Sequence, residues 1–205
     1  MTINRAFFFA HARQVLFDGA LKPPQVAGIS AILDKWEADM PNSDDRYLAY
    51  MLGTAHHETG RTMQPVRETF ASSDAQAIAR LNAAFKSGKL TWVKHPYWMP
   101  DANGKSWLGR GLVQITHQAN YQKLQTLTGI DITTDPNQAM VLSTAVAIMF
   151  QGMLTGAFTG KKLQDFFDGP KEKWREARSI INGLERADLV ASYARQYYAS
   201  ISYTV

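Results

Sequence analysis

The chain has 205 residues, of which 45% are hydrophobic and 20% are charged, and it contains no cysteine. These values are typical of a globular protein with one buried core; they exclude a disulfide-stapled scaffold and suit a reducing compartment. The formal net charge is +4, which suits an anionic partner, but the basic residues are scattered in pairs such as Arg175 and Arg178, as on a solvated surface, and no nucleic-acid-binding motif is present.

The N-terminal segment does not have the pattern of a signal peptide. Its apolar run, Phe7 to Phe9, is very short and is soon interrupted by His11 and Arg13. No later segment is long enough to span a membrane. We therefore expect neither a signal peptide nor stable insertion into a membrane.

Apolar residues at helical spacing predict three helices in the first 60 residues. The first covers about residues 3–16, with an apolar stripe at Phe8, Ala12 and Val15. The second ends before the turn at residues 41–43, and its stripe is Val26, Ile29, Leu33 and Trp36. The third runs from Asp44 to about Gly60.

The third predicted helix places an acid on its apolar face. Glu58 follows Ala55 by three residues and Met51 by seven, so its carboxylate lies on the stripe that should be buried. Such a group either loses its charge or finds a cationic or hydrogen-bonding partner, and a general acid needs a setting of this kind. The alternative is a boundary residue whose carboxylate reaches water.

A second acid, Glu68, follows ten positions later. In one continuous helix the two acids would be about 15 Å apart along the axis. However, Gly60 and Pro65 interrupt the helix, so Glu68 can fold back to face Glu58. Two carboxylates across a cleft are the usual means of cleaving a glycosidic bond, at about 6.5–9.5 Å for inversion or about 5–5.5 Å for retention. The sequence does not choose between these distances.

The histidines beside Glu58 raise the alternative of a metal site. A zinc-protease helix requires His-Glu-x-x-His, but the residue that follows His57-Glu58-Thr59-Gly60 is Arg61. His56 and His57 are adjacent and diverge on a helix. We therefore expect no metal site, and no cofactor, since two carboxylates and water suffice for glycoside hydrolysis.

The middle of the chain mixes a short helix with an irregular aromatic segment. Ser73 and Gln76 form a capping box ahead of a short apolar stripe that Gly88 closes. Residues 89–107 lack helical periodicity and predict a small hairpin or an ordered loop. Four aromatic residues there either stack on sugars or form the core of a small lobe: Trp92, Tyr97, Trp98 and Trp107.

Residues 109–116 predict a segment whose backbone packs closely against a neighbour, followed by a short strand. Gly109 and Gly111 flank Arg110, and the apolar residues after them alternate with Gln114 and Thr116. This alternation points Gln114 and Thr116 the same way. The polar face lines a cleft in one interpretation and is an exposed strand face in the other.

The last third of the sequence is helical. One helix reaches Thr128-Gly129, and a buried central helix starts at Asp135-Pro136 and includes Met153. The apolar stripe of Trp174, Ala177 and Ile181 predicts a third helix that runs up to Asn182-Gly183. A fourth helix follows it. With no internal repeat and no linker, we expect one mostly helical domain over residues 1–205, with a minor β element and no separate binding module.

Several of these motifs occur together in one known family. The sequence resembles the chitinase-like glycoside hydrolases of family 19, and among them the compact phage endolysins. The motifs that carry the resemblance are Ala55-His56-His57-Glu58-Thr59-Gly60, then Glu68, then Gly109-Arg110-Gly111-Leu112-Val113-Gln114-Ile115-Thr116 with Asn120-Tyr121, and finally Ile181-Asn182-Gly183-Leu184. They stand in the family's order and span most of the chain from the third helix onward.

The resemblance implies a fold and a set of roles. The fold would be a lysozyme-like, two-lobed helical domain with a small β element around a substrate cleft. Glu58 matches the general acid, Glu68 the general base, and Thr116 a hydroxyl that helps to hold the attacking water. Contacts with the sugar, or organisation of the cleft, are implied for Gln114, Asn120, Asn182, Arg110 and His57. For Arg110, neutralising a carboxylate of the site and bracing the loop both remain open.

The resemblance also implies a biological role, with alternatives. We expect an endolysin that hydrolyses β-1,4 bonds of peptidoglycan by inversion during host lysis. It would be a monomer that stays in the host bacterial cytoplasm until lysis, depends on a holin for release, and then acts in the periplasm on the cell wall. The alternatives are a chitinase acting on N-acetylglucosamine polymers and a non-catalytic wall-binding or virion protein.

Overall fold

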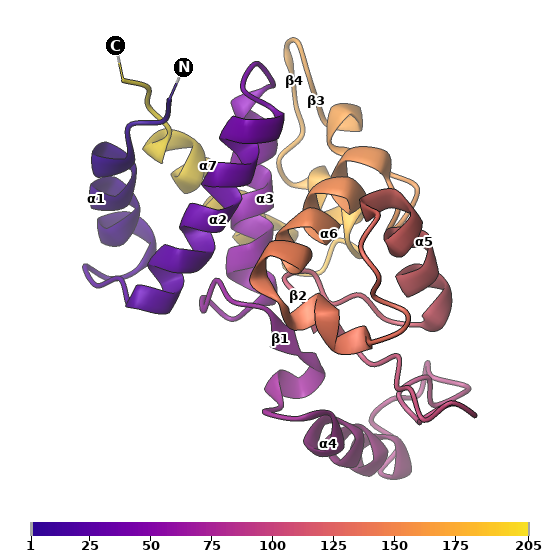
Figure 1. Ribbon diagram of the computed structural model, residues 1–205. Helices are drawn as coiled ribbons and strands as arrows, with labels where there is room; N and C mark the ends of the chain where they lie inside the picture. Colours follow the sequence, from indigo (N-terminus) through magenta and orange to yellow (C-terminus); the bar gives the residue numbers. More distant parts are fainter. Residues whose placement is uncertain (1, 205) are drawn as a thin grey trace. The chain divides into compact units, whose positions relative to one another are not determined.

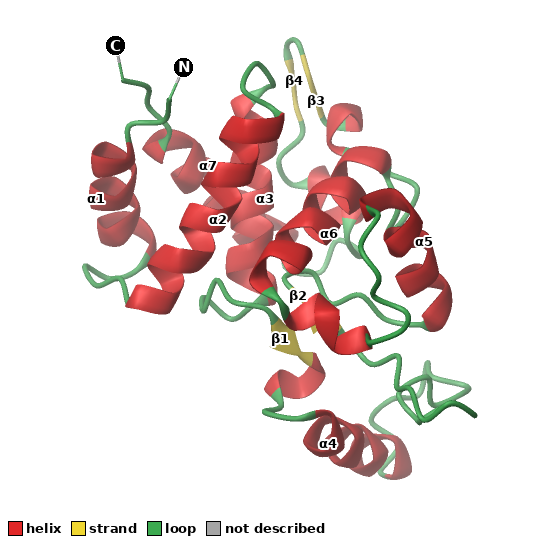
Figure 2. Cartoon of the chain, in the orientation of Figure 1, coloured by secondary structure: helices red, strands yellow, loops and turns green. Residues whose placement is uncertain are grey.

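The computed structural model describes residues 2–204, and within them the fold is mainly α with a small β element, as predicted (Figures 1 and 2). The helices are α1 (Arg5–Leu16), α2 (Pro23–Asp39), α3 (Asp45–Glu58), α4 (Asp74–Lys86), α5 (Gln118–Thr128), α6 (Leu142–Thr155) and α7 (Ala187–Ser200). The strands are β1 (Val66–Arg67), β2 (Arg110–Gly111), β3 (Phe167–Asp168) and β4 (Lys171–Glu172). Short 3-10 helices lie at Glu68–Phe70, Pro136–Met140, Leu163–Asp165 and Glu176–Ile180.

The described chain forms two compact units. The first comprises residues 2–64 and 149–204, and the second comprises residues 65–148. Along the chain, one border between the units lies at Pro65 and the other lies inside α6.

The first unit is organised around α3, which packs against α7, while α7 also packs against α1. Nearly every residue of α3 from Leu48 to Ala55 is buried, so the helix has no solvated face over that stretch. Gly53 makes the close packing feasible, because a Cβ there would lie 2.7 Å from the backbone nitrogen of Ala194. The helix thereby carries its last residue, Glu58, to the edge of this core.

The second unit contains a short antiparallel pair and a small core of its own. β1 pairs with β2, with Val66 opposite Gly111 and Arg67 opposite Arg110. α4 packs onto the aromatic segment through a cluster of buried residues: Ala71, Ala77, Leu81, Trp98 and Leu108. Of the four aromatic residues that sequence left open between core and sugar stacking, Trp98 and Trp107 are therefore core residues.

Most predicted helix ends are confirmed, because they rest on local capping. Asp44 accepts a hydrogen bond from the Arg46 amide, and Gly129 ends α5 in the left-handed conformation. Pro23 and Pro24 begin α2, where a proline costs no hydrogen bond. The Ser73 cap forms, but Gln76 reaches back to the Ser72 amide and not to the cap residue itself.

The predicted strand after Gly111 is wrong. Arg110 and Ile115 exchange two backbone hydrogen bonds, which closes the chain into a tight loop. The loop requires left-handed backbone at Gly111, with φ of 98°, and at Gln114, with φ of 54°. Alternating apolar residues therefore arise here from a turn, and Val113 and Ile115 are both buried.

Two helices predicted from periodicity are also different in the structure. The helix expected from Asp135 is a 3-10 helix, Pro136–Met140, which extended backbone at Val141 separates from α6. The helix expected to reach Asn182 is only the 3-10 helix Glu176–Ile180. With three residues per turn, Ala177 and Ile180 share the buried face, which replaces the predicted 3.6-residue stripe.

A smaller error concerns a single position at the edge of a stripe. Val15 was placed on the buried stripe of the first helix, but it is exposed, and Leu16 is buried in its place. A stripe predicted from spacing alone does not say where the neighbouring helix stops covering it.

Candidate active site

The first unit presents Glu58 at the C-terminal end of α3, paired with an arginine. Arg178 Nη1 donates a hydrogen bond to Glu58 Oε1 at 2.5 Å. The Arg178 side chain is 5% exposed and that of Glu58 is 16% exposed, so the pair is largely removed from water. Of the outcomes open to an acid on an apolar face, Glu58 therefore takes the one with a cationic partner.

Arg178 is a residue of this site that sequence reasoning missed. It was grouped with Arg175 as part of a solvated surface, but its guanidinium is buried, and its Nε also donates to the Glu185 carbonyl at 3.2 Å. The signal available in the sequence was indirect: a buried acid needs a cation, and several arginines were candidates. The two partners are separated by 120 residues, so no local pattern connects them.

The second oxygen of Glu58 is free of protein partners. Arg178 takes Oε1, and no group among residues 2–204 hydrogen-bonds to Oε2. The carboxyl group is thus oriented through one oxygen and open at the other, which suits exchange of a proton with a bound molecule.

The two histidines before Glu58 have different surroundings. His56 is buried, its Nδ1 lies 3.0 Å from the Tyr197 hydroxyl, and burial lowers its pKa to about 4. It is therefore neutral at pH 7 and belongs to the core. His57 is only partly buried; burial lowers its pKa, and the Glu58 carboxylate opposes this in part.

Asn182 lies in the same unit as Glu58 and Arg178 but is held locally. Its backbone amide donates to the Arg178 carbonyl at 3.2 Å, which ties it to the segment that carries the arginine. Its side-chain Oδ1 accepts from the Gly183 amide at 2.9 Å, and the side chain is exposed. It is accessible to a ligand but makes no bond to Glu58.

The second unit holds Glu68 through both carboxylate oxygens. The Tyr97 hydroxyl donates to Oε1 at 2.6 Å, and the Gly109 amide donates to Oε2 at 2.8 Å. The Glu68 amide in turn donates to the Gly109 carbonyl at 2.7 Å, so the backbone is paired as well. Burial and the Glu68 contact raise the pKa of Tyr97 above its usual range, so its hydroxyl remains a donor at neutral pH.

Gly109 has a packing reason to be glycine. A Cβ there would lie 3.2 Å from Glu68 Oε2 and 2.8 Å from Gln114 Oε1. The glycine therefore lets the backbone approach the carboxylate closely, as the sequence predicted for this motif.

Three further predicted residues lie on the loop that follows. Gln114 donates its amide to the Val66 carbonyl at 2.7 Å, which ties the loop to the strand preceding Glu68. Asn120 donates to the Thr116 carbonyl at 2.8 Å, while Thr116 itself is half-buried and borders a pocket. The second unit therefore gathers Glu68, Gln114 and Thr116 on connected segments.

Arg110 braces the loop. Its side chain is 1% exposed and forms an ion pair with Asp74 at 2.5 Å. The same guanidinium donates to the Ser106 and Leu108 carbonyls. Burial would raise the pKa of Asp74, but hydrogen bonds from Arg110 and Arg67 outweigh it and lower the pKa. Of the two roles left open for Arg110, its contacts support the structural one, and a guanidinium so buried does not meet a substrate in this conformation.

No family model, curated protein or solved structure matches this chain. Residues 2–204 contain no group of three or more His, Asp or Glu side chains placed to hold a metal ion. In the same part of the chain, no helix combines the length and the apolar character needed to cross a membrane.

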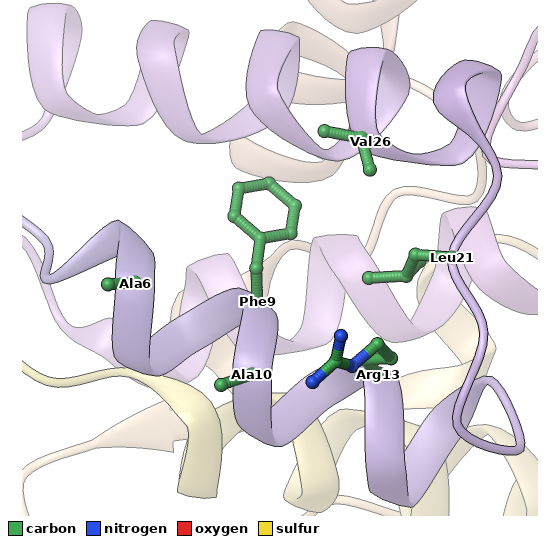
Figure 3. A pocket seen from close by; sticks show the side chains of 6 residues that line it. All are labelled: Ala6, Phe9, Ala10, Arg13, Leu21 and Val26. Atoms are coloured by element: carbon green, nitrogen blue, oxygen red, sulfur yellow. The ribbon is translucent and has the colours of Figure 1, made fainter.

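A pocket elsewhere in the first unit lacks catalytic groups. It lies between α1 and α2 and is lined by Ala6, Phe9, Ala10, Arg13, Leu21 and Val26 (Figure 3). Its walls are apolar apart from one guanidinium. None of the predicted site residues borders it.

Proposed function

We propose that this chain is a glycoside hydrolase that cleaves β-1,4 bonds of bacterial peptidoglycan, with Glu58 as general acid and Glu68 as general base. The observation that carries it is that both acids are held by specific donors: Glu58 by Arg178, and Glu68 by Tyr97 and the Gly109 amide.

The contacts suit a division of roles between the acids. A general base starts as a charged carboxylate and becomes neutral when it accepts a proton from water, and the two donors orient Glu68 in its charged form before that step. A general acid has to present a proton to the leaving oxygen, and Glu58 Oε2, which has no partner among residues 2–204, can carry it while Arg178 holds Oε1. In the proposed reaction Thr116 helps to hold the attacking water, and the anomeric configuration inverts.

The polar residues around the acids have supporting roles in this proposal. Gln114 and Asn120 keep the loop beside Glu68 in place through their bonds to backbone carbonyls. His57 is partly accessible and Asn182 is exposed in the unit that carries Glu58, and in this proposal both contact the sugar. No cofactor takes part.

The biological setting in the proposal is lysis of a bacterial host by a phage. The protein acts as a monomer on the cell wall after a holin has opened the inner membrane. This part rests on the family resemblance and on the net charge of +4, which suits an anionic wall polymer.

Release of reducing ends from purified peptidoglycan and from soluble chitin, measured in parallel, tests the proposal. Wild type should act on peptidoglycan, and Glu58→Gln and Glu68→Gln should each lose activity by orders of magnitude. The matched control is Glu172→Gln, because Glu172 is an exposed acid on β4 and should be dispensable.

The other outcomes lead to different functions. Faster cleavage of chitin would keep the mechanism and change the substrate to that of a chitinase. Loss of turbidity without new reducing ends would indicate a peptidase or an amidase. Binding to peptidoglycan without turnover, unchanged in Glu58→Gln, would indicate a non-catalytic wall-binding or virion protein.

A further inference from the structure

The second unit has a pocket of about 660 Å³ beside the residues that hold Glu68. It is lined by part of the aromatic segment and by the loop after Gly111: Trp92, Val93, Lys94, His95, Pro96, Tyr97, Thr116 and His117. Tyr97 connects it to the carboxylate, because the hydroxyl of this lining residue donates to Glu68 Oε1 at 2.6 Å. A ligand in this pocket is therefore close to the proposed general base.

Trp92 gives the pocket a solvent-exposed apolar surface. Its side chain is 74% exposed, whereas Trp98 and Trp107 of the same segment are buried. A sugar ring presents axial C–H groups, and an exposed indole is a suitable surface for them. His117 packs on Tyr97 with ring centroids 4.3 Å apart, so this ring contact orders the part of the pocket wall that the two residues form.

Lys94 gives the pocket a positive charge. Lys94 and His95 are exposed, and His117 is exposed as well, while none of the lining residues is an acid. A lysine at such a position attracts a carboxylate of the ligand more than it attracts a neutral group. The pocket therefore combines an aromatic surface with a positive charge.

We propose that this pocket binds a peptide-bearing sugar of peptidoglycan, with Trp92 against the sugar ring and Lys94 against a carboxylate of the lactyl-peptide substituent. The inference rests on the proposed hydrolase function and extends it, because it names the feature that separates peptidoglycan from chitin. Chitin is a neutral polymer of N-acetylglucosamine and offers Lys94 no charge. In this proposal Trp92 contributes to the binding of both polymers, and Lys94 contributes only to the binding of the acidic one.

Nucleic acid also combines rings with negative charge, but the pocket favours the sugar. A nucleic-acid site neutralises several phosphates along a groove. Here the pocket lining contains one lysine, which can pair with one carboxylate but cannot neutralise a run of phosphates.

Direct binding tests the inference without turnover. Glu58→Gln serves as the background, and the two ligands are a soluble tetrasaccharide of alternating N-acetylglucosamine and N-acetylmuramic acid with stem peptides, and chitotetraose of the same length. We expect Lys94→Gln to lower the affinity for the acidic ligand about three- to fivefold, as for the loss of one partly exposed ion pair, and to leave the affinity for chitotetraose unchanged. Trp92→Ala should weaken both about tenfold.

Two controls isolate the pocket. Lys86→Gln removes an equally exposed lysine on α4 that does not line the pocket, and it should change neither affinity. Raising the salt concentration from about 50 mM to about 300 mM should lower the affinity for the acidic ligand when Lys94 is present. The same change should lower the affinity of Lys94→Gln much less.

The results separate this inference from the proposed function. Equal affinities of Lys94→Gln and Lys86→Gln for the acidic ligand would overturn the inference, even if wild type cleaves peptidoglycan. The expected affinities with a wild type that releases no reducing ends would support the pocket and refute the hydrolase. Tighter binding of a single-stranded oligonucleotide than of the tetrasaccharide, lost in Lys94→Gln, would reassign the pocket to nucleic acid.

Discussion

Replacing Tyr97 by phenylalanine tests whether Glu68 needs its side-chain donor. The change removes one O–H donor, 2.6 Å from Glu68 Oε1, and keeps the ring that packs against Trp98 and His117. A hydrogen bond to a charged group contributes about 1.5–3 kcal/mol. Because Glu68 is only half-buried, water replaces part of this bond, so we expect a loss of about 1–2 kcal/mol in the free energy of unfolding.

The effect on activity should be larger on kcat than on KM. The Gly109 amide still holds Oε2, so the carboxylate stays nearby but rotates more freely. We expect kcat on peptidoglycan to fall about tenfold, with KM within about twofold, since a misplaced base slows the chemical step. Unfolding in urea and initial rates of reducing-end release provide both measurements.

The matched control is Tyr198→Phe, on α7, whose ring is partly exposed and whose hydroxyl is not part of the Glu68 contacts. It should leave kcat unchanged. A Tyr97→Phe protein with wild-type kcat and wild-type stability would refute the reasoning, because the Glu68 orientation would then not depend on this bond.

Three further predictions concern other contacts of the site and the core. Arg178→Met should destabilise the fold by about 2–4 kcal/mol, because Glu58 loses its cationic partner in a poorly hydrated setting, and Glu58→Gln in the same protein should recover at least about 1 kcal/mol of this. Gly109→Ala should lower kcat about 10- to 100-fold, because its Cβ would lie 3.2 Å from Glu68 Oε2. Wild type should lose about 2–3 kcal/mol of stability through His56 between pH 7 and pH 4.5, because the pKa of this residue is about 4 in the fold and about 6.5 when unfolded.

The sign of the His56 effect follows from proton binding. The unfolded chain takes up the proton more readily, so the contribution is complete above pH 6.5 and is lost as the pH falls towards 4. In His56→Leu the dependence on pH should be weaker by this amount; an unchanged slope would contradict the assignment.

The predictions for the Arg178–Glu58 ion pair and for Gly109 each have a control variant. For the ion pair, equal losses in Arg178→Met with and without Glu58→Gln would show that the two side chains are not coupled. For the glycine, the comparison is Gly104→Ala, whose Cβ would meet nothing within 4 Å, although Gly104, unlike Gly109, has left-handed backbone. It should lower stability and leave kcat unchanged.

Local patterns in the sequence were sufficient for most helices and for the position of Glu58. Apolar spacing predicted α1, α2 and α3, and an acid placed three and seven residues after apolar positions of α3 had to lie at the edge of the core. The caps at Asp44 and Gly129 were readable because their hydrogen bonds join residues only a few positions apart. Periodicity failed where the backbone left regular dihedrals, as in the loop of Gln114.

The partners of the two acids were decided only by the tertiary structure. Arg178 reaches Glu58 across 120 residues, and Tyr97 reaches Glu68 across 29, so neither contact leaves a periodic or local trace. The exposure of Trp92 beside the buried Trp98 likewise depends on which rings α4 covers. The sequence by itself determined which residues are acidic and which helix faces are apolar, because these follow from residue type and spacing. Only the packed chain determined what each acid touches, because that depends on segments brought together from distant parts of the chain.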